Sequence, residues 1–220
     1  MPKLSDFAAV IFDMDGLVLD TESICRHAWK MAASTMGYDF TDVFCESLSG
    51  LSSENGLAKI VSTFGTAFNT REFNALSEQH WYDWVNAHGI AVKTGFAPLM
   101  ASITTLNIPY CLATNTREKD ARTCLTYAGL SETFPVILSR DDVQHGKPAP
   151  DIFLAAAERL RVNIVDCLVL EDSYTGVMAA DKAGAYVVGV PSVWPMDERM
   201  RLHSTVIVND LTELLESFNA

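Results

Sequence analysis

The sequence predicts an α/β protein, with a parallel sheet covered by helices on both faces. Three observations support this class. The run from Ala8 to Phe12 is short and continuously apolar, and it ends in a polar loop that contains glycine, as a buried strand does. After Thr94, strand-like and helix-like segments alternate to the end of the chain. With 220 residues, 49% of them hydrophobic, the chain can also bury a large core.

The stretch between these two parts has a different pattern. From about Glu22 to Gly89, apolar residues recur every three to four positions, which is typical of amphipathic helices, and no strand-like run is obvious. We therefore expect an α-helical domain at residues 22–93, inserted into a core domain made of residues 1–21 and 94–220.

The elements after Thr94 follow a regular order. Helices are expected at residues 97–106 and 151–160 and at the C-terminal end. Two more helices are expected to end at residues 127 and 183. Strands are expected at residues 109–113, 136–138, 167–170, 186–190 and 206–208. This alternation predicts a parallel, Rossmann-like sheet core, in which ligands bind at the carboxyl ends of the strands.

Composition and charge narrow the class of partner. The formal net charge of -12 disfavours binding to nucleic acids and anionic membranes, because both are negatively charged as well. The five cysteines are scattered and form no C-x-x-C pair, so we expect reduced thiols that mostly lie in the core. The N-terminal apolar run is too short for a signal peptide, and no run of about 18 apolar residues occurs. We therefore expect a cytoplasmic, monomeric protein that binds a small molecule.

Polar residues gather where the predicted strands end. The groups are Asp13 with Asp15, Thr114 to Thr116, Lys147, and Glu171 with Asp172. Because the carboxyl ends of parallel strands share one edge of the sheet, we expect these groups to meet there. One lysine does not balance four carboxylates, so a hard divalent cation is implied. Mg²⁺ fits best, because it takes a few carboxylates together with waters and a substrate phosphate.

This set of groups is suited to phosphoryl transfer. One aspartate can attack phosphorus while the lysine and the metal ion absorb charge. Gly16 lets the chain turn sharply after Asp15, and the backbone N–H groups around Met14 and Asp15 can point at phosphate oxygens. Asn115 and Thr116 can either donate to phosphate or cap the helix that follows them.

These segments resemble the four motifs of the haloacid dehalogenase (HAD) superfamily of phosphotransferases. DMDGLVLDTE at 13–22 resembles the first motif, and ATN at 113–115 resembles the second. The lysine of GKPAPD at 146–151 resembles the third, and EDSYTGVMAADKAGA at 171–185 resembles the fourth and is the most specific. The helical stretch lies where that family has its inserted cap. The resemblance therefore covers nearly the entire chain, and it extends to the β-phosphoglucomutase and phosphatase subgroup.

The resemblance implies a role for each site residue. Asp13 would be the nucleophile that forms an aspartyl phosphate, and Asp15 the general acid and base. Thr114 and Lys147 would complete the catalytic set by holding the transferring phosphoryl group. The implied phosphate-binding and substrate-binding residues are Met14, Asp15, Thr114, Asn115, Lys147 and, in the cap, Gly50. The implied Mg²⁺ ligands are Asp13, the backbone carbonyl of Asp15, Glu171 and Asp172.

The presence of Asp15 also indicates which of the family's reactions to expect. Members that resemble haloacid dehalogenase or phosphonatase lack this second aspartate, because they do not protonate an alcohol, so its presence favours phosphoesters. A lone D-x-D also occurs in calcium loops, but an EF-hand needs glycine at its sixth position, and here Gly16 is fourth. A catalytically silent phospholigand-binding protein on the same fold is an alternative, although all four catalytic positions are filled.

The final phosphoryl acceptor is either water or a sugar hydroxyl. The stretch DTESICRHAWK resembles β-phosphoglucomutase, which is a phosphosugar mutase. We expect water instead, because Cys25 stands where the mutase pattern has a histidine. The polar cap loop from Ser47 to Asn55 also has no Lys or Arg to hold a second phosphate, although Arg26 or Lys59 could reach the site from elsewhere in the cap. The sequence thus predicts a Mg²⁺-dependent phosphatase for a sugar, polyol or nucleoside monophosphate.

Overall fold

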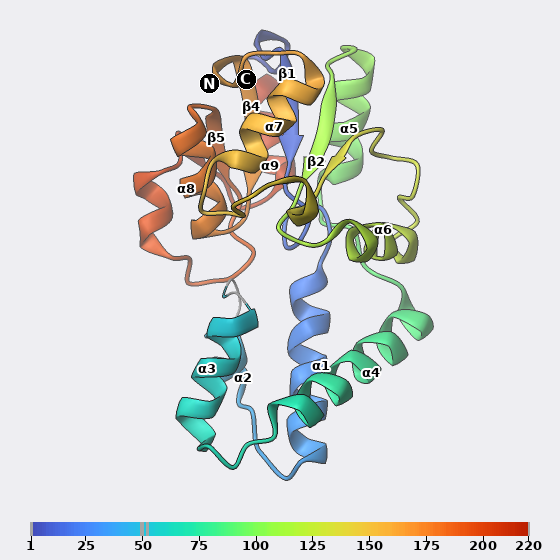
Figure 1. Cartoon of the computed structure of the whole chain (residues 1–220). Coiled ribbons are helices and arrows are strands. Elements are labelled where there is room, and N and C mark those ends of the chain that lie inside the picture. The colour runs from blue at the N-terminus through green and yellow to red at the C-terminus, as the bar shows by residue number, and fades with distance from the viewer. Residues whose placement is uncertain (1, 49–50, 52, 220) are drawn as a thin grey trace. The chain divides into compact units, whose positions relative to one another are not determined.

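The chain forms two compact units. The structure is a computed structural model, and it describes residues 2–48, 51 and 53–219. The core unit consists of Met1–Asp20 and Ala91–Ala220, and the helical unit consists of Thr21–Ile90. All strands labelled in Figure 1 belong to the core unit.

The core unit is built on one sheet with the strand order β3-β2-β1-β4-β5-β6. Its strands are β1 (Ala9–Phe12), β2 (Tyr110–Ala113), β3 (Ile137–Leu138), β4 (Cys167–Glu171), β5 (Tyr186–Gly189) and β6 (Val206–Ile207). Every neighbouring pair is parallel, so the carboxyl ends of these strands lie at the same edge of the sheet. The predicted α/β class with a parallel, Rossmann-like sheet is therefore confirmed.

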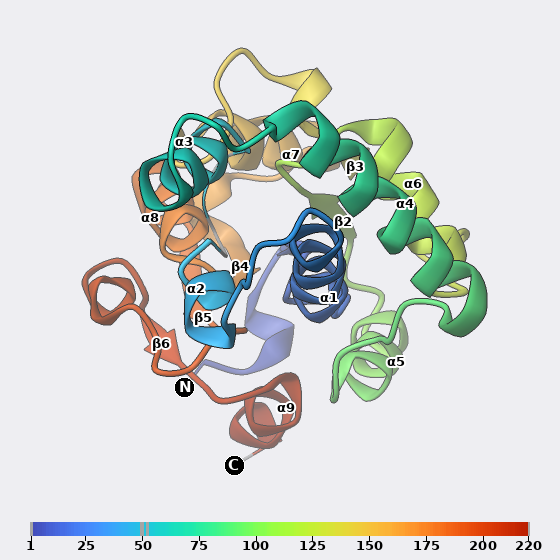
Figure 2. The same cartoon turned by 90° about the horizontal axis from the view of Figure 1, so that it is seen from below.

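Helices cover both faces of this sheet. On one face lie α7 (Asp151–Leu160) and α8 (Tyr174–Ala183), and on the other lie α5 (Phe96–Thr105) and α9 (Leu211–Asn219), as Figure 2 shows. The unit also contains α6 (Glu118–Tyr127) and the 3-10 helices η1 (Leu4–Asp6), η2 (Arg140–Asp142), η3 (Ile164–Asp166) and η4 (Glu198–Leu202).

The cover on both faces explains why β1 is apolar at every position. Neighbouring residues of a strand point to opposite faces of the sheet. Ile11 packs in the cluster that holds Ile152 of α7 and Val177 of α8. The ring of Phe12 lies 5.8 Å from the ring of Phe96 in α5. Because both faces are covered, a polar residue has no favourable place along this strand.

The helical unit is made of α1 (Thr21–Thr35), α2 (Asp42–Glu46), α3 (Ser53–Phe64) and α4 (Thr70–His88). Its buried cluster centres on Phe40, whose ring stacks on Phe64 at 4.8 Å and lies 5.4 Å from the ring of Phe73. Side chains cap two of the helices, because Thr41 accepts from Phe44 N–H and Asn69 accepts from Glu72 N–H. The periodicity that predicted helices in this stretch is therefore confirmed over its described residues.

The chain passes between the units through two adjacent segments. The backbone N–H of Asp20 donates to the carbonyl of Ala91 at 2.9 Å, and that of Lys93 donates to the carbonyl of Val18 at 2.9 Å. These bonds attach the returning segment to the core unit, which explains why the helical unit ends at Ile90.

The cysteines are free thiols in this structure, and four of the five are buried. Burial raises the pKa of Cys45 and the pKa of Cys167 to about 11. These two thiols therefore stay protonated at neutral pH and are poor nucleophiles.

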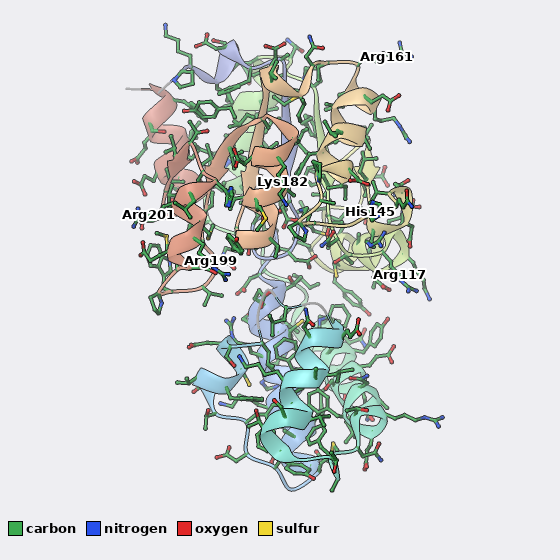
Figure 3. All side chains as sticks on the ribbon, turned by 60° about the vertical axis from the view of Figure 1, so that its left-hand side comes forward. Arg117, His145, Arg161, Lys182, Arg199 and Arg201 are labelled. Carbon is green, nitrogen blue, oxygen red and sulfur yellow. The ribbon has the colours of Figure 1, made fainter. Side chains whose placement is uncertain are left out.

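The basic side chains labelled in Figure 3 project from the core unit at separate places. Several of them are paired with acidic neighbours: Arg199 with Asp197 and Arg201 with Glu198.

Among the residues that the structure describes, no helix has both the length and the apolar character needed to cross a membrane.

Candidate active site

The predicted site residues of the core unit meet at the carboxyl edge of the sheet. In the register of the central strands, Phe12 of β1 lies opposite Leu112 of β2 and Leu170 of β4. The buried polar residues that lie one or two positions after this level are Asp13, Thr114, Glu171 and Asp172. These four side chains therefore lie together at one edge of the sheet, as the strand-end argument predicted, although they are up to 159 positions apart in the chain (172 minus 13). Their assignment to an active site stays a prediction.

Lys147 is buried at the centre of this group. Its Nζ donates to Asp13 Oδ1 at 2.5 Å, to Glu171 Oε1 at 2.6 Å and to the carbonyl of Ala113 at 2.8 Å. An ammonium group has three protons, so these three acceptors account for all of them. The lysine thus links the end of β1, the end of β2 and the end of β4.

Asn115 fixes the backbone of the lysine loop. Its Oδ1 accepts from the N–H of Lys147 at 2.9 Å, and its Nδ2 donates to the carbonyl of Lys147 at 3.2 Å. Both ends of the amide are therefore engaged with one residue of the loop. The sequence did not predict this positioning contact, and the assignment of Asn115 to phosphate stays a prediction.

Glu171 joins the site to the start of α8. Its Oε2 accepts from the backbone N–H of Asp172 at 3.0 Å, and from the N–H and hydroxyl of Ser173 at 3.2 and 3.1 Å. The hydroxyl of Ser173 in turn accepts from Gly176 N–H at 3.1 Å, so Ser173 is the N-cap of α8. Both oxygens of Glu171 thus have protein partners, and its assignment as a metal ligand stays a prediction.

Asp15 is held by Thr114 of the second motif and by Thr116, which directly follows that motif. Thr116 Oγ1 donates to Asp15 Oδ2 at 2.7 Å, and Thr114 Oγ1 donates to the same oxygen at 3.3 Å. The N–H of Thr116 also donates to the hydroxyl of Thr114 at 3.0 Å. The sequence left two roles open for Thr116, phosphate donor or helix cap. Its contact with the carboxylate of Asp15 is neither of these.

Asp172 is held by a residue that the sequence analysis missed. The hydroxyl of Ser192 donates to Asp172 Oδ2 at 2.5 Å. Ser192 follows β5, whose last residue, Gly189, pairs with Glu171. The strand-end argument could have found it, because the end of β5 lies at the same edge of the sheet.

Met14 and Gly50 are two further residues that were predicted to bind phosphate or substrate. The side chain of Met14 is fully buried, so only its backbone suits the predicted contact with phosphate. Gly50 lies outside the described residues. Next to the predicted cap loop, Lys59 Nζ donates to the carbonyl of Ser47 at 2.9 Å. A cation therefore lies beside the start of a loop that contains none of its own.

Comparison with known proteins gives the family. The model of the haloacid dehalogenase-like hydrolases matches residues 10–190. The chain belongs to this family. The match spans all four motifs, from Asp13 to the segment after Glu171, together with the helical stretch between the first two.

Individual relatives of this HAD-like hydrolase carry out different reactions. The chain is 30% identical to the bifunctional riboflavin kinase/FMN phosphatase of Arabidopsis thaliana over 97% of this chain but only 55% of that longer protein. It is 32% identical to β-phosphoglucomutase of Bacillus subtilis (strain 168), over 86% of this chain and 85% of that protein. A crystal structure from Thermotoga maritima, provisionally named a β-phosphoglucomutase, has a TM-score of 0.81 and 27% identity, covering 96% of this chain and 98% of that one. The predicted subgroup is therefore confirmed.

The charges in the site of this HAD-like hydrolase act on one another. Burial raises the pKa of Asp13 well above its ordinary value; Lys147 opposes this shift, and the charges of Glu171 and Asp15 add to it. Burial alone would lower the pKa of Lys147, but the adjacent Asp13 and Glu171 carboxylates outweigh it and raise that pKa. Lys147 is therefore an ammonium ion at neutral pH.

The donor set fits a hard divalent cation. Asp13, Glu171 and Asp172 can each offer one carboxylate oxygen, and these oxygens lie within 4.8 Å of one another. One ammonium ion does not neutralise three buried carboxylates, and unbalanced buried charge is costly. Oxygen donors in small number, with room left for water and phosphate, are what Mg²⁺ prefers.

Proposed function

We propose that this HAD-like hydrolase is a Mg²⁺-dependent phosphatase, which hydrolyses a small phosphomonoester through an aspartyl phosphate on Asp13. The observation that carries the proposal is the contact of one buried ammonium group, Lys147 Nζ, with Asp13 at 2.5 Å, beside a second carboxylate, Asp15, held by two threonines. A nucleophile, a cation and an acid are the groups that transfer of phosphate from an ester requires. The FMN phosphatase activity in the name of one relative supports the same reaction.

In the first step, a carboxylate oxygen of Asp13 attacks phosphorus and the bond from phosphorus to the ester oxygen breaks. Asp15 gives its proton to the leaving alcohol. Lys147 and the hydroxyl of Thr114 stabilise the charge on the phosphoryl oxygens. The products of this step are a free alcohol and an acyl phosphate on Asp13.

In the second step, water attacks the phosphorus of the acyl phosphate, and Asp15 takes a proton from that water. The bond between Asp13 and phosphorus breaks, inorganic phosphate leaves and the carboxylate is restored. Asp15 ends this step protonated, ready to act as the acid again.

Mg²⁺ would be held by Asp13, Asp172, the backbone carbonyl of Asp15 and, where its present partners allow, Glu171. When bound, it supplies positive charge next to the phosphoryl oxygens, which lowers the repulsion between an anionic nucleophile and an anionic substrate. We further propose that the helical unit is the cap, and that its polar loop, Ser47–Asn55, contacts the hydroxyls of a sugar, polyol or nucleoside monophosphate.

Turnover of p-nitrophenyl phosphate with Mg²⁺, compared between wild type and Asp13→Asn, tests the proposal. An amide cannot form the acyl phosphate, so we expect the variant to lose all but a trace of activity while its far-ultraviolet circular dichroism is unchanged. Asp83→Asn, at an exposed position of α4, is the matched control and should keep full activity. A wild type without activity on a broad panel of phosphate esters would favour the silent phospholigand-binding alternative.

A phosphosugar mutase is the second candidate, because one relative at 32% identity is β-phosphoglucomutase. The two reactions differ in the final acceptor of the phosphoryl group. Incubation with β-glucose 1-phosphate, a trace of β-glucose 1,6-bisphosphate and Mg²⁺ separates them. We expect free phosphate to accumulate; efficient formation of glucose 6-phosphate without matching phosphate release would establish the mutase instead.

A further inference from the structure

We infer that Ser192 is a positioning residue that makes the carboxylate of Asp172 offer a single oxygen, and that it thereby favours Mg²⁺ over Ca²⁺. The inference rests on the proposed function, in which Asp172 is a metal ligand. Ser192 lies outside the four motifs of the family, in the segment that follows β5.

The backbone places Ser192 firmly at the edge of the sheet. The N–H of Val190 donates to the carbonyl of Glu171 at 2.7 Å, which extends the pairing of β5 with β4 by one position. Pro191, which follows, is buried and has a fixed φ. Ser192 is the next residue, and its hydroxyl reaches Asp172 Oδ2 at 2.5 Å.

Gly16 encloses the same oxygen from another direction. Its φ of +85° is a left-handed conformation, and a Cβ atom built there would lie 2.0 Å from Asp172 Oδ2 and 3.0 Å from the Cβ of Ser192. The backbone of the first motif is thus packed directly against Oδ2. This oxygen has the hydroxyl of Ser192 on one side and the Gly16 backbone on another.

The other two carboxylates of the cluster are restrained in a similar way. Lys147 occupies Asp13 Oδ1 and Glu171 Oε1, and backbone N–H groups occupy Glu171 Oε2. The protein therefore limits how many carboxylate oxygens it offers to a cation. Among these donors, Ser192 is a neutral side chain, and it acts on Asp172.

The two cations respond differently to such restraint. Ca²⁺ takes six to eight oxygen ligands and often binds both oxygens of one carboxylate, whereas Mg²⁺ needs a small octahedral shell and keeps several waters. An Asp172 whose Oδ2 is held by Ser192 matches the needs of Mg²⁺ and denies Ca²⁺ a second oxygen. Loss of such a supporting hydrogen bond commonly lowers metal affinity by about 10-fold to 100-fold.

The test is titration of the chelator-stripped protein with MgCl₂ and with CaCl₂ by calorimetry, which reads binding and not turnover. Ser192→Thr and Ser192→Val form a matched pair of similar shape that differs in the hydroxyl group. We expect the threonine variant to keep the wild-type ratio of the Ca²⁺ Kd to the Mg²⁺ Kd. In the valine variant, the Mg²⁺ affinity should fall by about 10-fold and the ratio should shrink accordingly.

Equal weakening of both cations, or no change in either, would overturn the inference, since a merely loosened loop has no reason to discriminate between them. Ser192→Ala serves as a second hydroxyl-free variant should the valine variant fail to fold. Asp172→Asn separates this result from the proposed function. If that variant binds Mg²⁺ as tightly as wild type, Asp172 is not a ligand and the proposed metal site itself is wrong, whatever the Ser192 variants show.

Discussion

At the scale of single residues, Lys147 is the buried cation of the candidate site, and all three of its protons have acceptors. It neutralises part of the charge of Asp13 and Glu171, and it donates to the carbonyl of Ala113. In the proposed reaction, its charge would move from the resting carboxylates toward the phosphoryl oxygens as they gain negative charge. Such a preorganised cation needs little rearrangement at the moment of reaction.

Lys147→Ala should lower kcat by a factor that corresponds to about 3 kcal/mol, the usual cost of losing one preorganised stabiliser of transition-state charge. Lys147→Arg should not restore the rate, because a planar guanidinium cannot replace three short bonds from one nitrogen. Steady-state kinetics with Mg²⁺ gives both parameters. An increase in KM with kcat unchanged would instead make Lys147 a ground-state binding group.

The raised pKa of Asp13 predicts how the stability of the metal-free protein depends on pH. A carboxyl group whose pKa is higher in the folded state binds its proton more tightly there. Its contribution to stability is complete below the unfolded value of about 3.9, and it is lost as the pH rises through the raised folded value. Asp13→Asn removes this group, so the variant should gain stability relative to wild type as the pH rises from about 4 through that raised pKa.

Urea unfolding in excess chelator at a series of pH values measures this difference directly. Asp83→Asn, the exposed control, should follow the wild-type curve, because its carboxylate lies at the surface of the helical unit. Parallel curves for wild type and Asp13→Asn would show that Asp13 has an ordinary pKa in the folded protein.

At the scale of elements, the first turn of helix α8 is hydrogen-bonded directly to the candidate site. Glu171 ends β4, its carboxylate accepts from Ser173, and Ser173 caps the helix through Gly176 N–H. A Cβ atom at Gly176 would lie 1.8 Å from Glu171 Cδ. The glycine is therefore required because the first turn of α8 rests against the carboxylate that also binds Lys147.

Gly176→Ala should destabilise the protein by roughly 1–3 kcal/mol, the usual cost of forcing an extra group into a packed site. Gly56→Ala in α3 is the matched control, because a Cβ atom there meets nothing within 4 Å. Alanine favours a helix over glycine by roughly 0.5–1 kcal/mol, so the control should be slightly stabilised. The midpoint of urea unfolding reports both changes; equal effects of the two substitutions would contradict the contact with Glu171.

At the scale of the whole molecule, the acidic cluster makes stability depend on the cation. Three carboxylates meet one ammonium group in the buried site, so Mg²⁺ should bind the folded state far better than the unfolded chain. At 100 times its Kd, such a ligand stabilises the fold by about 2.7 kcal/mol. Addition of MgCl₂ to chelated protein should therefore raise Tm, and excess chelator should abolish phosphatase activity.

Asp172→Asn provides the control for this experiment, because it removes one ligand and leaves the fold's other contacts in place. Its Tm should respond to MgCl₂ much less than that of wild type. Full turnover by the wild-type enzyme in excess chelator would exclude a metal ion from the reaction.

The order of strands and helices could be predicted because its signals are local. A fully apolar run such as Ala8 to Phe12 and the three-to-four-residue periodicity of the helical stretch are properties of neighbouring residues. The parallel arrangement then brought Asp13, Thr114 and Asp172 to one edge without any knowledge of side-chain contacts. Family membership followed from the same motifs, which the match to residues 10–190 confirms.

Only the tertiary structure decided which partner each polar group took. Thr116 and Asp15 are 101 positions apart, Asn115 and Lys147 are 32 apart, and Ser192 and Asp172 are 20 apart. A hydroxyl or amide group can bond to many partners, and its own sequence neighbourhood does not distinguish among them. The apolar pattern therefore determined where the chain runs, because burial depends on residue type. A hydrogen bond of the site forms only when the donor–acceptor distance is right to within a few tenths of an ångström. These distances are set only once the sheet has brought its strand ends together.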